Sequence, residues 1–302
     1  MGEIEGQRTR IAGDPPARLS RHDWAARRAD YLSRVESLVR DYLGRMTRRE
    51  KHPVYDFLFV YYSFRSAHLL RWTPGADVVV EGAVAGDLEW GEFVAVAGGY
   101  LLPAAAFPTH RLPYARWALE HLGATSAREP SFACFGLHEW AMVYRDADVR
   151  HPAVPFRLSR AATDAVVESQ TLRCSHYDAF RFFTPAAGPR NRVPLTRATM
   201  TDHDQPGCVH ANMDLYRFAY KVAPFCPSDV VADALGLAVA AREVDMRASP
   251  YDLAEYGFPA VRIETREGRE EYVELQRELY LRGVPVRERL RDVYAKILSA
   301  AP

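Results

Sequence analysis

The sequence lacks several patterns that would place it in a common class. Its four cysteines never form a C-x-x-C pair, so a structural zinc ribbon is not indicated. No apolar run approaches the roughly 20 residues needed to span a bilayer. The polar N-terminus has no signal-peptide pattern. We therefore expect a cytoplasmic protein, without membrane segments, whose thiols stay reduced.

Neither sign of charge is in excess, because 39 Lys and Arg residues balance 39 Asp and Glu residues. A chain without net positive charge has no general attraction for nucleic acid or anionic lipid. Residues 1–75 hold a local excess of arginine, which a solvated helix face explains as well as a nucleic-acid patch. We therefore expect a small-molecule substrate as the partner, with nucleic acid as the less favoured alternative and no membrane.

The common catalytic motifs are also missing. The sequence has no H-E-x-x-H, no pair of E-x-x-H helices, no G-x-S-x-G, no G-x-G-x-x-G and no G-x-x-x-x-G-K-[ST]. These absences argue against zincins, di-iron carboxylate bundles, α/β-hydrolases, dinucleotide-binding enzymes and P-loop NTPases. A function has to be sought in residues outside the familiar signatures.

What the sequence does contain is mostly helical periodicity, in a chain whose 302 residues are 48% hydrophobic and can form a large core. Helices are predicted over 20–42, 54–65, 114–122, 132–144, 161–169, 207–222, 228–246 and 263–300. Valine-rich segments around 76–103, broken at Gly98 and Gly99, predict a small β hairpin or sheet. We predict a mainly α fold, with a flexible leader over 1–19 and a single compact multi-helix domain over 20–302 that carries the β insertion.

One pattern of residue types occurs three times between residues 134 and 214. Each copy places a cysteine, a histidine and a carboxylate within seven residues: Cys134, His138 and Glu139; Cys174, His176 and Asp178; Cys208, His210 and Asp214. Imidazoles, carboxylates and thiols are the side chains that bind metals and move protons. We interpret this segment as the working centre of the protein.

Helix geometry selects metal ligands from the three copies. His210 and Asp214 are four residues apart on an expected helix, which places both on one face. His138 and Glu139 are adjacent and diverge by about 100° on a helix, so only one of them is expected to face the centre. We predict a site of His138 or Glu139, His176, His210 and Asp214 that holds iron or, next in order, zinc, with haem as a further alternative. The cysteines are interpreted as packing neighbours.

Aromatic and arginine residues predict a substrate pocket beside this centre. Tyr62 and Arg65 lie at the end of the aromatic segment 54–65, and Arg181 lies among phenylalanines. A guanidinium in such surroundings either pairs with a carboxylate or binds an anionic ligand. The predicted catalytic residues are Asp178, Arg181 and Tyr62, and the predicted substrate-binding residues are Arg65, Phe182 and Asn212.

Five segments of the chain also carry a resemblance to a known family. They are HPVYDFLF (52–59), GLHEWAMVYR (136–145), HYDAFRFFTP (176–185), QPGCVHANMD (205–214) and DMRASPYD (245–252). Through them, most of the chain after residue 50 resembles an actinobacterial family labelled 3-methyladenine DNA glycosylase. The resemblance implies hydrolysis of the N-glycosidic bond of an alkylated purine flipped out of DNA, with aromatic rings stacking on the base. It also implies that a carboxylate such as Asp178 or Asp214 stabilises the developing positive charge.

Three functions follow from these observations. The first is a metal-dependent enzyme, an oxidoreductase or a hydrolase, that acts on a small aromatic or anionic substrate and for which non-haem iron is the favoured ion. The second is the DNA glycosylase. The third is a non-catalytic binding protein whose His–Asp pairs are internal hydrogen bonds. We place the metalloenzyme first because a metal centre uses the three clusters directly, whereas glycosylase chemistry does not require them.

Overall fold

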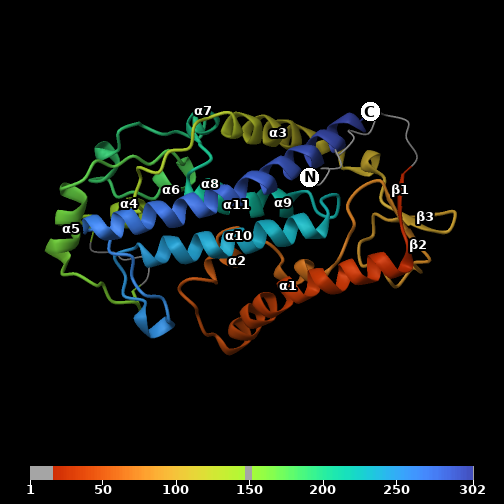
Figure 1. Ribbon diagram of the computed structural model, residues 1–302, viewed down its shortest axis with the longest axis horizontal. Coiled ribbons are helices and arrows are strands. Elements are labelled where there is room, and N and C mark those ends of the chain that lie inside the picture. The colour runs from red at the N-terminus through yellow and green to blue at the C-terminus, as the bar shows by residue number, and fades with distance from the viewer. Residues whose placement is uncertain (1–15, 147–151, 302) are drawn as a thin grey trace, which may run out of the picture.

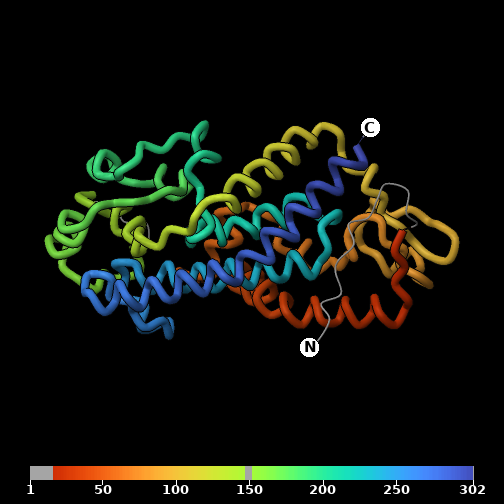
Figure 2. Tube along the Cα trace, turned by 45° about the horizontal axis from the view of Figure 1, so that its top comes forward, coloured from red at the N-terminus to blue at the C-terminus, as the bar shows by residue number. Residues whose placement is uncertain are grey.

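Two long helices, α10 (Ser228–Arg247) and α11 (Arg266–Ser299), form the centre of the molecule. The structure is a computed structural model, and it describes residues 16–146 and 152–301. Figure 1 shows the two helices side by side along the longest axis, and the turned view of Figure 2 keeps them adjacent. Helix α1 (Arg21–Arg48) packs on α10, and α3 (Leu112–Ser126) packs on α11. The predicted mainly α fold is confirmed.

The long helices follow from local signals in the sequence. The Ser20 side chain caps α1 by accepting a hydrogen bond from the Asp23 backbone, and Thr265 caps α11 in the same way through Gly268. Buried residues of α1 recur at three- and four-residue spacing from Tyr31 to Tyr42, and Trp24 lies on the same face, seven residues before Tyr31. The C-terminal pattern over 263–300 forms the single helix α11, which continues through Pro285.

A small sheet lies at one end of the molecule (Figure 1). Its strands are β1 (Ala17–Leu19), β2 (Val78–Glu81), β3 (Val94–Val96) and β4 (Gly99–Leu101), in the order β1-β2-β4-β3. β1 pairs parallel to β2, and the other pairs are antiparallel. A side chain at Gly99 would collide with the Val80 carbonyl oxygen, so glycine allows the close pairing. The sheet predicted around 76–103 is therefore confirmed.

The predicted leader needs a correction at its end. Residues 17–19 form β1 rather than a flexible segment, because their backbone groups hydrogen-bond to β2. Residues 1–15, the rest of that predicted leader, lie outside the described residues. The residues 147–151, between two of the predicted helical segments, lie outside them as well.

The remaining helices are short: α2 (Phe57–Val60), α4 (Leu137–Ala141), α5 (Arg160–Glu168), α6 (Tyr177–Phe180), α7 (Met200–His203), α8 (Val209–Met213) and α9 (Leu215–Lys221). Helix α5 matches the segment predicted over 161–169, whereas α2, α4, α8 and α9 replace three longer predicted helices. The segments 54–65 and 132–144 are helical only over α2 and α4, and the helix predicted over 207–222 divides into α8 and α9 at Asp214. Such short elements depend on packing, since one turn of helix is unstable alone.

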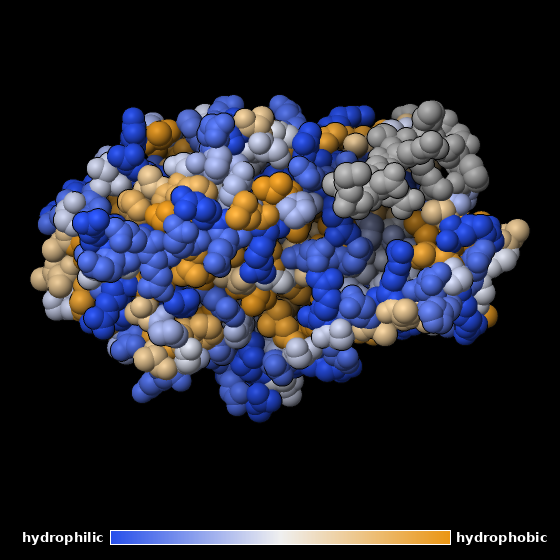
Figure 3. All heavy atoms as spheres, viewed as in Figure 1, coloured by the Kyte–Doolittle hydropathy of each residue, from blue (hydrophilic) through white to orange (hydrophobic). Residues whose placement is uncertain are grey.

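Figure 3 shows polar and apolar side chains interspersed over one face of the molecule. Scattered apolar side chains are normal on a protein surface. Among the described helices, none combines the length and the apolar character that crossing a membrane requires.

Candidate metal centre

Four elements bring the predicted ligands together. Helix α4 carries His138 and Glu139, α8 carries His210, and His176 directly precedes α6. Asp214 joins α8 to α9, and both of these helices pack on α10. The repeated pattern therefore converges in space, although its copies are distant in sequence.

The ligand atoms do not form one shell but two neighbouring groups. His138, His210 and Asp245 make up the first, which we name the His210 group; His176, Asp178 and Asp214 make up the second, named the His176 group. Within each group the ligand atoms lie within 4.8 Å of one another, and each group can hold a metal ion. The rings of His210 and His176 stack at a centroid distance of 5.6 Å, so the groups adjoin.

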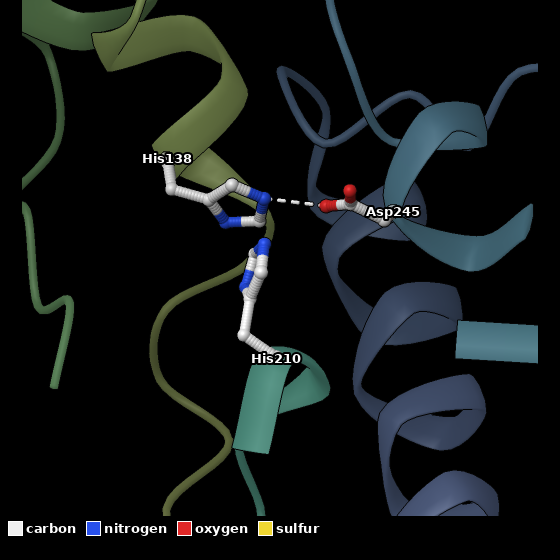
Figure 4. A group of neighbouring side chains, drawn as sticks. All are labelled: His138, His210 and Asp245. Carbon is white, nitrogen blue, oxygen red and sulfur yellow. Dashed lines mark hydrogen bonds and ion pairs between the residues drawn. The ribbon is translucent and has the colours of Figure 1, made fainter. Parts of the chain in front are cut away.

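In the His210 group, two imidazoles and a carboxylate face one another (Figure 4). His138 hydrogen-bonds through Nε2 to Asp245 of α10, and the His138 and His210 rings meet edge to face at 4.2 Å. The other Asp245 oxygen accepts from Arg242 Nη1 at 2.5 Å, and the same nitrogen donates to Glu139 at 3.0 Å. Arg242 therefore fixes the orientation of the carboxylate.

His210 is held as a neutral imidazole. Burial, and then the adjacent His138, lower the pKa of His210 well below its ordinary value. Among the described residues, its ring nitrogens have ring neighbours but no hydrogen-bond or ion-pair partner. A half-buried, neutral and unpartnered imidazole is suited to donate a lone pair to a metal ion.

The His176 group has the opposite electrostatic character. Burial by itself would lower the pKa of His176, but Asp204 and then Asp214 raise it to about 9. His176 Nδ1 lies 3.0 Å from Asp204 Oδ1, and its Nε2 lies 3.7 Å from Asp214 Oδ2. The other Asp204 oxygen lies 3.1 Å from His121 Nε2. At neutral pH this group therefore holds a proton on His176.

Arg217 and Tyr62 already bind the carboxylates of the His176 group through an ion pair and hydrogen bonds. Arg217 donates to Asp178 at 2.8 Å and lies 2.5 Å from Asp214. The Tyr62 hydroxyl donates to the other Asp214 oxygen at 2.8 Å. Although burial raises the pKa of Asp178, Arg217 lowers it below its ordinary value. A cation bound at these carboxylates would have to compete with a guanidinium that is already in place.

Charges in and around the two groups do not cancel. The carboxylates are those of Glu139, Asp178, Asp204, Asp214 and Asp245. They face the largely buried guanidiniums of Arg217 and Arg242 and the more exposed one of Arg181, 3.4 Å from Asp178, which leaves two negative charges. Protonated His176 balances one of the two. Uncompensated charge is costly in a protein interior, so a bound cation would be favourable here.

A cavity of about 210 Å³ opens onto both groups. Its polar lining includes Glu139, Asp178, Asp214, Arg242, His176 and His210. Its apolar lining includes four aromatic rings, those of Phe57, Tyr61, Tyr62 and Phe182. One oxygen of buried Glu139 has no hydrogen-bond partner among the described residues. Aromatic walls beside charged groups are suited to a small flat ligand.

Only some of the residues predicted to act on or bind the substrate lie at the cavity. Tyr62 and Phe182 line the cavity, and Arg181 lies beside it, 3.4 Å from Asp178 and 4.4 Å from the centre of the Phe182 ring. Arg65 is exposed and does not line the cavity, so it is not placed to bind substrate there.

Asn212 also departs from its predicted role. It is fully buried, donates to the carbonyls of Pro206 and Cys208, and accepts from Arg287 at 2.8 Å. Any side chain at Gly283 of α11 would collide with it. Asn212 therefore fixes α8 to α11 instead of binding substrate.

The predicted single shell needs one further correction. Helix spacing pairs Asp214 with His210, but α8 ends at Met213, so Asp214 leaves that helical face and joins His176 instead. Of the adjacent His138 and Glu139, only His138 belongs to one of the two groups. His138 contacts Asp245, while Glu139 contacts Arg242 and lines the cavity.

Sequence reasoning missed Asp245, Asp204 and Arg217. Asp245 follows Arg242 by three residues in a polar segment that is typical of a helix end. Nothing in that segment indicates that Asp245 is buried within α10. Arg217 follows Asp214 by three residues, a spacing typical of a helical ion pair. Asp204 carries no local signal, because its partners His121 and His176 come from distant segments.

Comparisons with protein-family models, with curated proteins and with solved structures found no match to this chain. The function is therefore inferred from the geometry of the two groups and the cavity between them.

Proposed function

We propose that the protein is a metal-dependent enzyme whose ion is held by His138, His210 and Asp245. The observation that carries the proposal is the donor set: two imidazoles and one carboxylate whose ligand atoms lie within 4.8 Å of one another. This combination is typical of non-haem iron(II) oxygenases, so iron is the ion we favour. Arg242 provides the hydrogen bond to the ligating carboxylate that such sites use to orient their ligands.

The cavity provides the place for a substrate. Its volume of about 210 Å³ suits a small flat aromatic molecule, which would stack against Phe57, Tyr61 or Phe182. Arg242 lies over the Phe57 ring at 4.2 Å, which adds a cation beside the aromatic wall. His210 lines the same cavity, so a substrate there lies next to the proposed ion.

Each residue of the site has a distinct part in the proposed reaction. When bound, the ion supplies an open coordination position at which oxygen or water is activated. His176, with its pKa raised to about 9, holds a proton at the wall of the cavity and can donate it. Tyr62 and Arg217 fix Asp214 beside it. The aromatic rings exclude water from the substrate.

Zinc and haem are the alternatives to iron at this site. Zinc accepts the same donors, and with zinc the protein would be a hydrolase. Haem fits poorly, because the cavity is smaller than the roughly 300–1,000 Å³ of pockets that hold drug-sized ligands.

Elemental analysis of untagged, purified protein tests the proposal. We expect close to one equivalent of iron, retained on gel filtration. Asp245→Asn should lose that iron, because it weakens a ligand, while Asp178→Asn in the neighbouring group should keep it. Metal-free protein that folds normally and takes up no added iron(II) or zinc would instead support a non-catalytic binding protein.

One observation favours the DNA glycosylase as a second candidate. Asp178 lines the aromatic cavity and is held ionised by Arg217, as the carboxylate that stabilises a developing positive charge would be. Release of 3-methyladenine from alkylated DNA by metal-free protein, abolished in Asp178→Asn and kept in Asp245→Asn, would establish this activity. The same pair of variants therefore gives opposite results for the two functions.

A further inference from the structure

The carboxylates that line the aromatic cavity differ in how fully they are bound. Asp178 and Asp214 are each paired with Arg217, and each contacts a second group as well. Glu139 accepts only one hydrogen bond from the described residues, at Oε1 from Arg242. Its Oε2 is enclosed and has no hydrogen-bond partner among them. Because a carboxylate has about four acceptor positions, most of the hydrogen-bonding capacity of Glu139 is unused.

Arg242, the partner of Glu139, also has an unused group. Its Nη1 donates to Glu139 and to Asp245, but its Nε has no hydrogen-bond partner in the described part of the chain. The Arg242 side chain is buried and lies over the Phe57 ring at 4.2 Å. Glu139 and Arg242 both line the cavity. The cavity wall therefore contains an unpaired acceptor and an unpaired donor on two bonded neighbours.

These two groups set a requirement for whatever enters the cavity. Buried polar groups without partners are uncommon in folded proteins and are costly. When a ligand displaces water from such a site, it keeps its affinity only if it reproduces the hydrogen bonds that the water made. A substrate in this cavity therefore has to offer a donor to Glu139 and an acceptor to Arg242.

The opposite charges of Glu139 and Arg242 restrict the charge of the substrate. An anionic group that reaches Arg242 also meets the carboxylate of Glu139, and a cationic group that reaches Glu139 also meets Arg242. Like charges brought together in a buried site are costly. A neutral edge with an N–H donor beside a carbonyl acceptor avoids both conflicts. Among flat rings, this edge is found in cyclic amides.

We propose that the substrate is a neutral, flat heteroaromatic ring with a cyclic-amide edge, whose N–H donates to Glu139 and whose carbonyl oxygen accepts from Arg242. The ring stacks on Phe57, Tyr61 or Phe182 in the cavity wall. Glu139 is then the residue that determines specificity. This inference deepens the proposed function and rests on it only in taking the cavity as the substrate site.

Two matched rings test the proposed edge. They are 2-quinolinone, a cyclic amide, and N-methyl-2-quinolinone, in which a methyl group replaces the N–H hydrogen. We expect 2-quinolinone to bind the full-length, metal-free protein about tenfold to 100-fold more tightly in isothermal titration calorimetry, because a hydrogen bond to a carboxylate is charge-assisted. The flat anion 2-naphthoate should bind more weakly than 2-quinolinone, because it has no donor for Glu139.

A pair of glutamate variants separates the hydrogen bond from the size of the methyl group. Glu139→Gln keeps the size of the side chain but leaves a neutral acceptor, so it should reduce the preference for the N–H ring by about fivefold or more. The matched control Glu243→Gln changes a half-buried glutamate that bonds to Tyr55 away from the cavity, and it should keep the preference. A preference that persists in Glu139→Gln would come from a methyl clash and would overturn the proposal.

The unaltered protein provides a test that does not depend on variants that fold. Equal affinity for the two rings, undetectable binding of 2-quinolinone, or tighter binding of 2-naphthoate overturns the proposal. Failure of this inference is distinguishable from failure of the proposed function, because the titrations use metal-free protein. Iron uptake without a preference for the N–H ring would remove only the substrate class. The preference without iron uptake would remove only the ion.

Discussion

The two His–Asp groups contain similar residues, yet they are suited to different tasks. In the His210 group, the central imidazole is neutral and unpartnered among the described residues, since burial and His138 disfavour its charged form. In the His176 group, Asp204 and Asp214 favour the charged form, so the imidazole keeps a proton. The number of carboxylates around each ring thus decides between binding a metal and storing a proton.

The largest expected difference between the groups concerns their arginines. Arg242→Met should lower the free energy of unfolding of the metal-free protein by about 3–5 kcal/mol, because Glu139 and Asp245 are left buried without a cation. Arg217→Met should lower the free energy of unfolding by less, because the Arg217 and Asp178 side chains are 17% and 18% exposed and therefore partly solvated. Urea denaturation at pH 7 measures both values. An equal loss of unfolding free energy in the two variants would contradict the explanation that deeper burial makes Arg242 the more important arginine.

The next expected difference concerns metal affinity. His210→Ala should weaken iron(II) or zinc binding by more than about 100-fold, because losing a ligand exceeds the effect of losing a ligand's partner. His176→Ala should change it by less than about threefold, since His176 is protonated and bonded to Asp204. Competition with a chelating dye measures both affinities. The reverse order would move the ion to the His176 group.

The pH dependence of stability should have opposite signs for the two histidines. Because the pKa of His176 is raised to about 9, its contribution is complete below pH 6.5 and is lost as the pH rises through 9. We expect a loss of about 1–3 kcal/mol over that interval. Because the pKa of His210 is lowered, its contribution is present above pH 6.5 and is lost as the pH falls below that value.

Denaturation series across this pH range measure these slopes. Asp204→Asn removes the carboxylate that most raises the pKa of His176, so it should flatten the alkaline slope and leave the acid slope intact. An alkaline slope that persists in Asp204→Asn would show that another group causes it.

The smallest expected effect concerns Tyr62. Tyr62→Phe removes the hydroxyl that donates to Asp214 at 2.8 Å and should cost about 1 kcal/mol of stability. Metal affinity should stay unchanged, because Asp214 lies outside the His210 group. Thermal unfolding together with the metal titration checks both. A tenfold loss of metal affinity would instead connect Asp214 to the ion.

Local patterns in the sequence were enough to predict the long helices and the sheet. Helix α1 has a serine cap and apolar residues at helical spacing, and the valine segments with their glycine break became β2, β3 and β4. The segment 207–222 also has helical spacing, but the chain breaks at Asp214. Short helices are held by tertiary contacts, so periodicity alone cannot place their ends.

The sequence by itself determined which residue types gather at the centre, because three histidines with neighbouring carboxylates and cysteines are visible as a repeated pattern. Only the tertiary structure decided how these residues separate into the His210 group and the His176 group. Asp245 and Asp204 reach the histidines from α10 and from the residues after α7, so no local spacing reveals them. The same packing brought Cys134, Cys174 and Cys208 to one cavity. Ligand sets depend on distances of a few ångströms between segments, and those distances are fixed only when the core packs.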